Sequence, residues 1–203
     1  MVNSIRRATV ADVRELAEIH IAGWRGAYQH IFPPEMFAAR TVDVRELEFR
    51  DLFSKDAAPC IWVSESAGRI VGFAYTRPGE EPDVVDGGEL KLFYVLPELR
   101  GTGIGLPLFE YAVADLATRG LEPYLYTLRD NAAARAWYAE RGWRHDGAVA
   151  LWSDRGEYPE ILEVRYRPDS ADPRSFRSLV GTLVWQAEDI ITPGENEWEA
   201  DAD

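Results

Sequence analysis

A glycine-rich corner between a predicted strand and a predicted helix constrains the fold of this chain more than any other feature. Residues 89–96, ELKLFYVL, have the composition of a strand, and residues 104–119 have the apolar spacing of a helix that stops at Gly120. Three glycines alternate between them, Gly101, Gly103 and Gly105. Unpaired amides at a helix start bind anions, and glycines let phosphate oxygens approach the backbone. The corner therefore indicates a phosphate site, or else only a tight connection.

The two common nucleotide-binding motifs do not fit this corner. The residues three positions beyond Gly103 and Gly105 are leucines, so the pattern G-x-G-x-x-G fails, and no Gly-Lys-Ser/Thr sequence occurs. Arg100, directly before the glycines, adds a planar cation that suits a phosphate. A different anion-binding arrangement is needed.

The predicted elements alternate along the chain in a mixed order. A helix capped by Thr9 or Asp12 and a helix capped by Asp130 or Asn131 are the clearest. We expect strands at 4–9, 60–66, 70–76, 89–96, 123–128, 148–152 and 160–168, and helices at 9–31, 33–53, 104–119 and 131–141. The last two strands are expected to pair as a closing antiparallel ribbon. This order, without an internal repeat, excludes a solenoid or a helical bundle and predicts an α/β chain with a mixed sheet.

Charge and composition restrict the partners. The net charge of −13 disfavours nucleic acid and anionic membranes and attracts cationic small molecules. No apolar run approaches the roughly 20 residues that span a bilayer, and Cys60 is the only cysteine, so we expect a cytoplasmic protein without disulfides. The three histidines are far apart, which predicts no metal site.

The chain changes character after residue 168. We expect one domain over residues 1–168, followed by an acidic extension over 169–203 that contains an amphipathic helix. The extension could cap a groove or mediate dimerisation, so a monomer and a homodimer both remain open.

Two motifs together resemble the GCN5-related N-acetyltransferase (GNAT) family. Residues 100–105 match its Arg-x-x-Gly-x-Gly pattern, and residues 131–143, NAAARAWYAERGW, match its Asn-x-x-Ala-x-x-x-Tyr-x-x-x-Gly-Phe segment, with Trp143 in place of Phe. Pro107 is a departure that removes one amide from the first helical turn. The resemblance covers most of residues 1–168. It implies the acyl-CoA N-acyltransferase fold, a central mixed sheet flanked by helices in which the strand before the loop splays from its neighbour.

The same resemblance implies acetyl-CoA as cosubstrate and assigns residues to it. The backbone groups that would pair with the pantetheine arm belong to Tyr94, Val95 and Leu96. The amides that would hold the pyrophosphate belong to Arg100, Gly101, Thr102, Gly103, Ile104 and Gly105. Asn131 would hydrogen-bond the arm and Tyr138 would protonate the departing thiolate. These two residues are seven apart, about two helical turns, and can face one cleft; the alternatives are an N-cap and a packing residue.

The residues expected to bind the acceptor amine are less specific to the family. Strand alternation puts Glu89 on one face with Lys91, Phe93 and Val95, so its carboxylate could accept the proton of an amine, or it is a solvated residue at a strand start. Trp24 and Tyr28 lie four apart and share a helix face, which predicts an aromatic rim for the substrate or, equally, core packing. His30 and His145 are weaker candidates for the base.

The sequence thus predicts an N-acetyltransferase that moves an acetyl group from acetyl-CoA to a primary amine of a small molecule by direct attack. Cys60 has no histidine near it in sequence, so a covalent acyl-enzyme is not expected. Two alternatives stay open. One is an enzyme that acetylates protein or peptide N-termini or lysines, and the other is an acyl-CoA-binding module without turnover.

Overall fold

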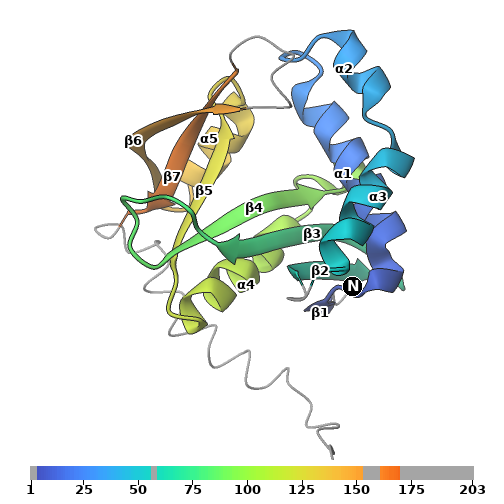
Figure 1. The fold of residues 1–203 in the computed structure, drawn as a ribbon, viewed down its shortest axis with the longest axis horizontal. Helices are drawn as coiled ribbons and strands as arrows, with labels where there is room; N and C mark the ends of the chain where they lie inside the picture. Colours follow the sequence, from blue (N-terminus) through green and yellow to red (C-terminus); the bar gives the residue numbers. More distant parts are fainter. Residues whose placement is uncertain (1–3, 56–58, 153–160, 170–203) are drawn as a thin grey trace, which may run out of the picture.

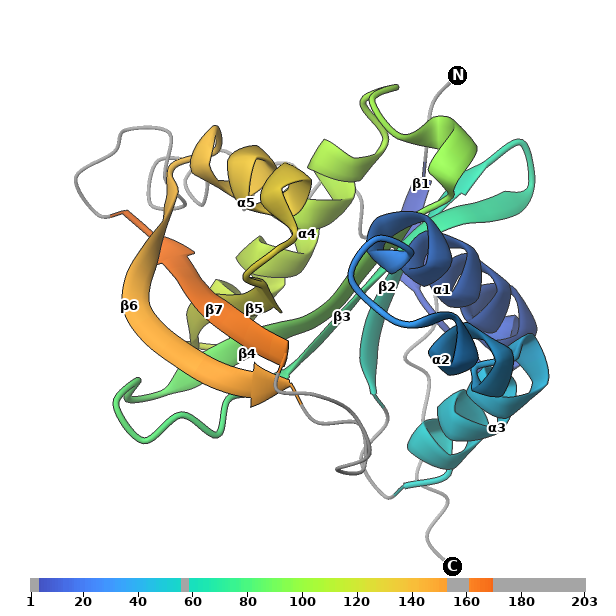
Figure 2. The same ribbon diagram turned by 90° about the horizontal axis from the view of Figure 1, so that it is seen from above.

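The computed structural model describes residues 4–55, 59–152 and 161–169. They form a seven-stranded sheet of order β1-β2-β3-β4-β5-β7-β6 with helices on both faces (Figures 1 and 2). The strands are β1 Ser4–Arg7, β2 Cys60–Ser66, β3 Arg69–Pro78, β4 Gly87–Val95, β5 Glu122–Leu128, β6 Trp143–Trp152 and β7 Ile161–Pro168. The helices are α1 Val13–Tyr28, α2 Pro34–Ala39, α3 Val42–Phe53, α4 Gly105–Thr118 and α5 Ala132–Ala139, with short 3-10 turns at Val10–Asp12 and Pro97–Leu99. The predicted fold class is confirmed.

Alternating residues of the central strand β3 build the core on both faces of the sheet. Phe73 packs with the apolar faces of α1 and α3, and its neighbour Ala74 packs with α4 and α5. Both side chains are fully buried, as expected for a strand covered by helices on each side. The helices are therefore fixed relative to the sheet by its two apolar faces.

The only parallel pairing recorded in the described part of the sheet joins β4 to β5, and it is short. Gly87, Gly88 and Glu89 pair with Glu122, Pro123 and Tyr124, and no pairing is recorded beyond them. From there β4 follows β3, whereas β5 follows β7 (Figure 1). The predicted splay of these two strands is thus present, and it opens toward Val95 on one side and Leu128 on the other.

The predicted helix over 33–53 is instead two helices. Arg40 leaves the helical conformation, with φ −96° and ψ 86°, and ends α2. The hydroxyl of Thr41 then accepts a hydrogen bond from the Val44 amide at 3.3 Å and caps α3. A cap residue inside the segment therefore divides it, and the break turns residues 40–45 toward α1.

The closing ribbon is present as an antiparallel pair of β6 and β7, and β6 begins earlier than predicted, at Trp143. A register shift between His145 and Val149, where Gly147 has φ 101°, separates its two halves. The turn predicted between the two strands and the helix predicted in the extension lie outside the described residues. No helix in the described part is long and apolar enough to cross a membrane.

Two glycines on α1 let the helix lie close to the end of β4. A Cβ added to Gly23 would lie 2.6 Å from Cδ1 of Tyr94, whereas one added to Gly26 would come no closer than 3.5 Å, to the Arg100 guanidinium. The Tyr94 ring is itself packed against His20 and Phe73, with centroid distances of 4.7 and 5.8 Å, so a shift of the ring away from Gly23 would disturb these contacts.

The Gly23→Ala substitution should therefore lower the free energy of unfolding by about 1–3 kcal/mol, the usual cost of overpacking. Gly26→Ala is the matched control on the same helix. It gains the same helix propensity without the clash and should be neutral or stabilising by up to about 1 kcal/mol. Urea unfolding of both variants measures the difference, and equal stabilities would contradict the close approach.

Candidate active site

The corner before α4 presents backbone amides to solvent. Gly101 and Gly103 have φ angles of 77° and 93°, a left-handed conformation that side chains disfavour. The Thr102 hydroxyl donates to the carbonyl of Leu99 at 2.7 Å and holds the turn. Within the described residues, no hydrogen bond is recorded from the amides of Gly101, Gly103 and Ile104, and α4 has no side-chain cap. These donors and the positive end of the helix form a site suited to an anion.

Arg100 lies beside this corner and against α1. Its guanidinium donates to the carbonyl of Gly23 at 2.9 Å, which uses one of the five N–H donors of the side chain. The contact ties the corner to α1 and holds a positive charge next to the exposed amides.

The end of β4 offers one residue whose backbone faces the splay. The Leu96 amide donates to the Val71 carbonyl of β3 at 2.9 Å, and the Leu96 carbonyl accepts from the Leu99 amide at 2.9 Å. Hydrogen bonding alternates along an antiparallel strand, so Tyr94 also turns its backbone toward β3 and Val95 turns away from it. Of the three residues predicted to contact a cofactor arm, Val95 alone has both backbone groups directed toward β5.

Asn131 combines a cap with a second contact. Its side-chain oxygen accepts a hydrogen bond from the Ala134 amide at 3.1 Å and begins α5, and the residue is buried. Burial raises the pKa of Tyr28, while side-chain hydrogen bonds with Tyr94 and Asn131 act in the opposite direction. Asn131 therefore links α5 to the tyrosine pair of α1 and β4 across the splay.

Tyr138, two turns after Asn131, is buried in an aromatic cluster. Its ring centroid lies 5.8 Å from that of Phe109 and 6.0 Å from that of Tyr166. Burial, assisted by the neighbouring Tyr28, raises the pKa of Tyr138 well above its usual value. The phenol therefore keeps its proton at neutral pH and can act only as a donor or a neutral acceptor.

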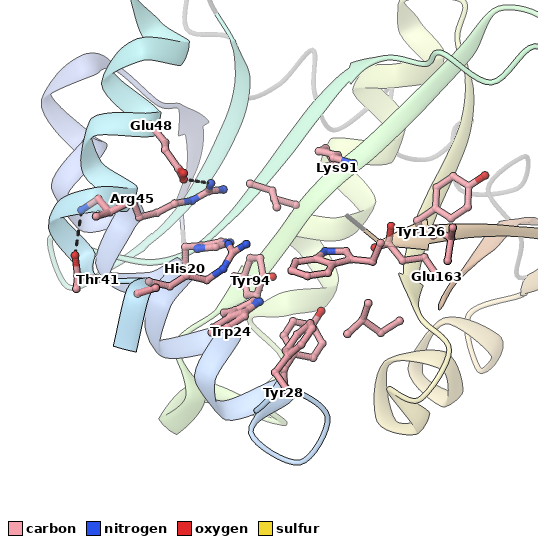
Figure 3. Close-up of a pocket in the computed structure, with 18 residues that line it drawn as sticks. His20, Trp24, Tyr28, Thr41, Arg45, Glu48, Lys91, Tyr94, Tyr126 and Glu163 are labelled. Atoms are coloured by element: carbon pink, nitrogen blue, oxygen red, sulfur yellow. Dashed lines mark hydrogen bonds and ion pairs between the residues drawn. The ribbon is translucent and has the colours of Figure 1, made fainter. Parts of the chain in front are cut away.

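A cavity of about 580 Å³ lies beside Tyr28 and Tyr94 (Figure 3). It is bounded by α1 and α3 on one side and by β4, β5 and β7 on the other. Trp24 and Tyr28 both line it. Trp24 also stacks on Phe32 with a centroid distance of 5.2 Å and lies 4.6 Å from Phe37, so it belongs to the core as well. Both residues thus line the cavity and pack in the core, and their role as a rim for the substrate remains a prediction.

Glu89 lies outside the lining of this cavity. It is 3% exposed, and its carboxylate accepts from Arg77 Nε at 2.6 Å and from Lys91 Nζ at 3.2 Å. The expected alternation does not hold along the whole of β4, because its pairing with β3 contains a register shift. Leu90 pairs with Thr76 and Leu92 pairs with Tyr75, so Lys91 between them has no partner residue on β3. Lys91 lines the cavity, whereas Glu89 is part of an ion-pair network beside it.

Two carboxylates line the cavity, Glu48, which pairs with Arg45, and Glu163 of β7, and neither was predicted from the sequence as a site residue. Burial raises the pKa of Glu163, the charge of Lys91 acts in the opposite direction, and Glu89 raises it further. Glu163 lines the cavity together with Tyr126 and Lys91 (Figure 3). The sequence shows only a charged residue in an alternating strand. Its position depends on the insertion of β7 between β5 and β6.

Polar residues of α1 and α3 were also missed. His20 and Arg45 line the opposite part of the same cavity. Burial, with further contributions from Arg45 and Arg40, lowers the pKa of His20 well below its usual value, so its ring is neutral. The helical pattern of α1 indicates that His20 is on the buried face, but nothing in the sequence shows that this face borders a cavity.

Comparison with known proteins gives three consistent findings. A family model described as the acetyltransferase (GNAT) family matches residues 15–143. The chain is 36% identical over 122 residues to a mycothiol acetyltransferase of Amycolatopsis mediterranei, which covers 57% of this chain but only 40% of that protein. It is 31% identical over 146 residues to an uncharacterized N-acetyltransferase of Archaeoglobus fulgidus, covering 69% of this chain and 92% of that one.

Among solved structures, the PaiA N-acetyltransferase of Thermoplasma acidophilum, in complex with coenzyme A, superposes with a TM-score of 0.63. The sequences are 18% identical, and the match covers 82% of this chain and 99% of that one. This likeness shows a shared fold.

The raised pKa of Glu163 predicts a pH-dependent effect of Glu163→Gln on stability. A protonated Glu163 favours the folded state, so its contribution is present below the ordinary pKa of about 4.5 and is lost as the pH rises through the raised folded value. Glutamine resembles the protonated form. The variant should therefore gain stability over the unmodified protein as the pH rises from 4 to 8.

Urea unfolding across that pH range measures the effect. Glu35→Gln, which alters an exposed carboxylate on α2, is the control and should change the free energy of unfolding by no more than about 0.5 kcal/mol. A stability gap for Glu163→Gln that stays constant or narrows with rising pH would show that the carboxylate is not desolvated.

Proposed function

The chain belongs to the GNAT family of acetyltransferases, and from that premise we propose that it transfers the acetyl group of acetyl-CoA to a primary amine of a small molecule by direct attack. One observation carries the proposal. The unpaired amides before α4 follow the open edge of β4, Asn131 and Tyr138 lie on α5, which follows β5, and Tyr28 and Tyr94 line a cavity of about 580 Å³ between α1 and the diverging strands. A cavity of this size suits a small ligand.

The corner before α4 fits the pyrophosphate of coenzyme A. A Cβ added at Gly101 or Gly103 would meet no atom within 4 Å, so the space around these amides is open to a ligand. The helix end supplies positive partial charge, and Arg100 adds a full charge. Pro107 lies within the first turn of α4, where its missing amide would have no partner in the helix. The relative with coenzyme A bound supports the same ligand for this fold.

The splayed edge of β4 supplies the next contacts. The Val95 backbone would pair with the pantetheine arm, and the Asn131 side chain would contact the same arm from α5. A strand amide directed at the thioester carbonyl would also stabilise the oxyanion that forms when the amine attacks. These groups are held by the sheet and need no rearrangement at the moment of reaction.

Glu163 and Tyr138 would each take part in one of the two proton transfers. The amine nitrogen forms a bond to the acetyl carbon, the carbon–sulfur bond breaks, and the sulfur leaves as a thiolate. We assign the proton released by the amine to Glu163 on the cavity wall, with Glu89 as the alternative, acting through water. Tyr138, which is protonated before the reaction, would give its proton to the thiolate, and the proton taken up by the carboxylate would return to the phenolate through solvent.

Gly103→Ala should weaken binding of coenzyme A at least tenfold, because its φ of 93° is strained for any side chain and the loop must shift. Gly120→Ala is the matched control. Gly120 has φ 74°, equally open surroundings and a place at the far end of α4. Calorimetry should show a loss of affinity for the first variant only. Equal affinities for both variants would exclude the corner as the phosphate site.

Tyr138→Phe and Glu163→Gln should each lower kcat by about 10²-fold or more while leaving the affinity for coenzyme A within a factor of about two. Thiol release over a panel of amines measures kcat, and calorimetry measures the affinity. Glu89→Gln is the comparison for the base: a larger loss there than in Glu163→Gln would transfer the role to Glu89. Tight binding of coenzyme A without any amine-dependent thiol release would favour the binding module over the enzyme.

A further inference from the structure

The cavity beside the splay is more positive than the protein around it. Three cationic side chains line it, Arg40, Arg45 and Lys91, against two acidic ones, Glu48 and Glu163. The whole chain carries a net charge of −13. A local excess of positive charge inside a strongly negative protein favours a ligand with an anionic group, because short-range contacts in a cavity outweigh the screened field of distant charges.

Arg45 provides a donor that the protein leaves unused. Its Nη1 donates to Glu48 at 2.6 Å, and its guanidinium lies 4.6 Å from the centre of the Phe49 ring. Its Nε is buried, and no hydrogen-bond partner is recorded for it among the described residues. A buried donor on a cation without a partner is costly, so an acceptor atom is expected to reach it in the working enzyme.

His20 adds a second unused polar atom on the same wall. The residue is 3% exposed, and no hydrogen-bond partner is recorded for its Nδ1 among the described residues. Arg45 and Arg40 both act on its ionisation, which places their charges near the ring. The Arg40 guanidinium lies 5.0 Å from the Trp24 ring and 5.4 Å from the Trp152 ring, so two aromatic faces hold it at the cavity.

The carboxylate Glu163 lies across the cavity from this wall. Figure 3 shows Arg45 and Glu48 on one side and Glu163, Tyr126 and Lys91 on the other. Arg45 acts on the ionisation of Tyr94, and Glu163 acts on that of Tyr28. Because Tyr28 and Tyr94 are hydrogen-bonded to each other, this pair lies between the two charged walls.

We infer that the acceptor is an amino acid-like molecule, a primary amine that also carries a carboxylate. Its carboxylate would contact Arg45 Nε and His20 Nδ1–H, and its amine would face Glu163 and the splay. A carboxylate matches this wall because it accepts several hydrogen bonds in one plane and pairs with a guanidinium. The side chain of the acceptor would lie against Trp24, Phe32 and Trp152. This inference rests on the proposed function and names its substrate class.

Matched ligands test the inference on the full chain. L-phenylalanine, L-leucine and L-methionine are each compared with the corresponding amide and the decarboxylated amine, and thiol release from acetyl-CoA gives kcat/KM. For at least one of the three side chains, kcat/KM for the acid should exceed kcat/KM for its amide and for its decarboxylated amine at least tenfold. In Arg45→Gln this preference should fall at least tenfold, while Glu48→Gln, which removes a competing carboxylate, should maintain or increase it.

Arg50→Gln is the control variant. Arg50 lies on the same helix, is half-exposed, pairs with Glu46 at 2.7 Å and does not line the cavity. It should keep the preference for the acids. Amides or amines that are acetylated as well as the acids would overturn the inference, and so would a preference that survives in Arg45→Gln.

The two proposals can fail separately. If coenzyme A binds but no amine is acetylated, the proposed function fails. Calorimetry with the three acids, their three amides and their three amines, in the presence of coenzyme A, then tests the inference about the ligand. Binding of the acids alone, lost in Arg45→Gln, would support it. Binding that is absent, or independent of the carboxylate, would refute it. If amines are acetylated equally well with and without a carboxylate, the proposed acetyltransferase function is supported and the proposed substrate class is refuted.

Discussion

The divergence of β4 from β5 after three paired residues is the constraint on which the site depends. Two strands that separate in the middle of a sheet leave backbone groups without partners, which is costly unless something else satisfies them. Each strand keeps one neighbour, β3 for β4 and β7 for β5, so the sheet survives the gap. The open edge of β4 thereby faces β5 directly before the chain reaches the amides that precede α4. The proposed use of that edge by a cofactor arm would restore the missing hydrogen bonds.

The position of β7 depends on a buried cation in the same strand as the cavity carboxylate. Arg165 is 3% exposed and donates to Asp83 at 2.5 Å and to Asp146 at 2.7 Å. These contacts join β7 to the loop before β4 and to β6 through one buried guanidinium, although the side chain of Asp83 is itself 61% exposed. Glu163 is two residues away in the same strand. Arg165 is thus paired with acidic groups on both sides of the strand, while no ion pair is recorded for Glu163 among the described residues and burial raises its pKa.

The corner and α5 could be predicted because each is encoded in contiguous residues, whereas the splay was implied by the family resemblance. Gly101 and Gly103 stand where the chain adopts positive φ, and Asn131 begins its helix as a cap. The acceptor side could not be predicted in the same way. Strand alternation assigned Glu89 and Lys91 to one face, but only Lys91 lines the cavity, because the Glu89 carboxylate is held in ion pairs beside it. Arg45 and Glu163 are far apart in sequence, and only the break before α3 and the insertion of β7 bring them to one cavity. The net charge likewise favoured cationic ligands, whereas the cavity carries a local positive excess.

Packing and chemistry are not competing interpretations for the residues around the splay. Asn131 caps α5 with its oxygen, which fixes its amide group toward Tyr28. Tyr138 is buried among Phe109, Trp143 and Tyr166, and that burial is the largest cause of its raised pKa. An exposed tyrosine at this position would also be protonated at neutral pH, so what burial adds is the exclusion of water and of competing proton donors from the sulfur. The same apolar contacts that stabilise α5 against the sheet would therefore keep water and other donors away from Tyr138 until a thiolate forms beside it.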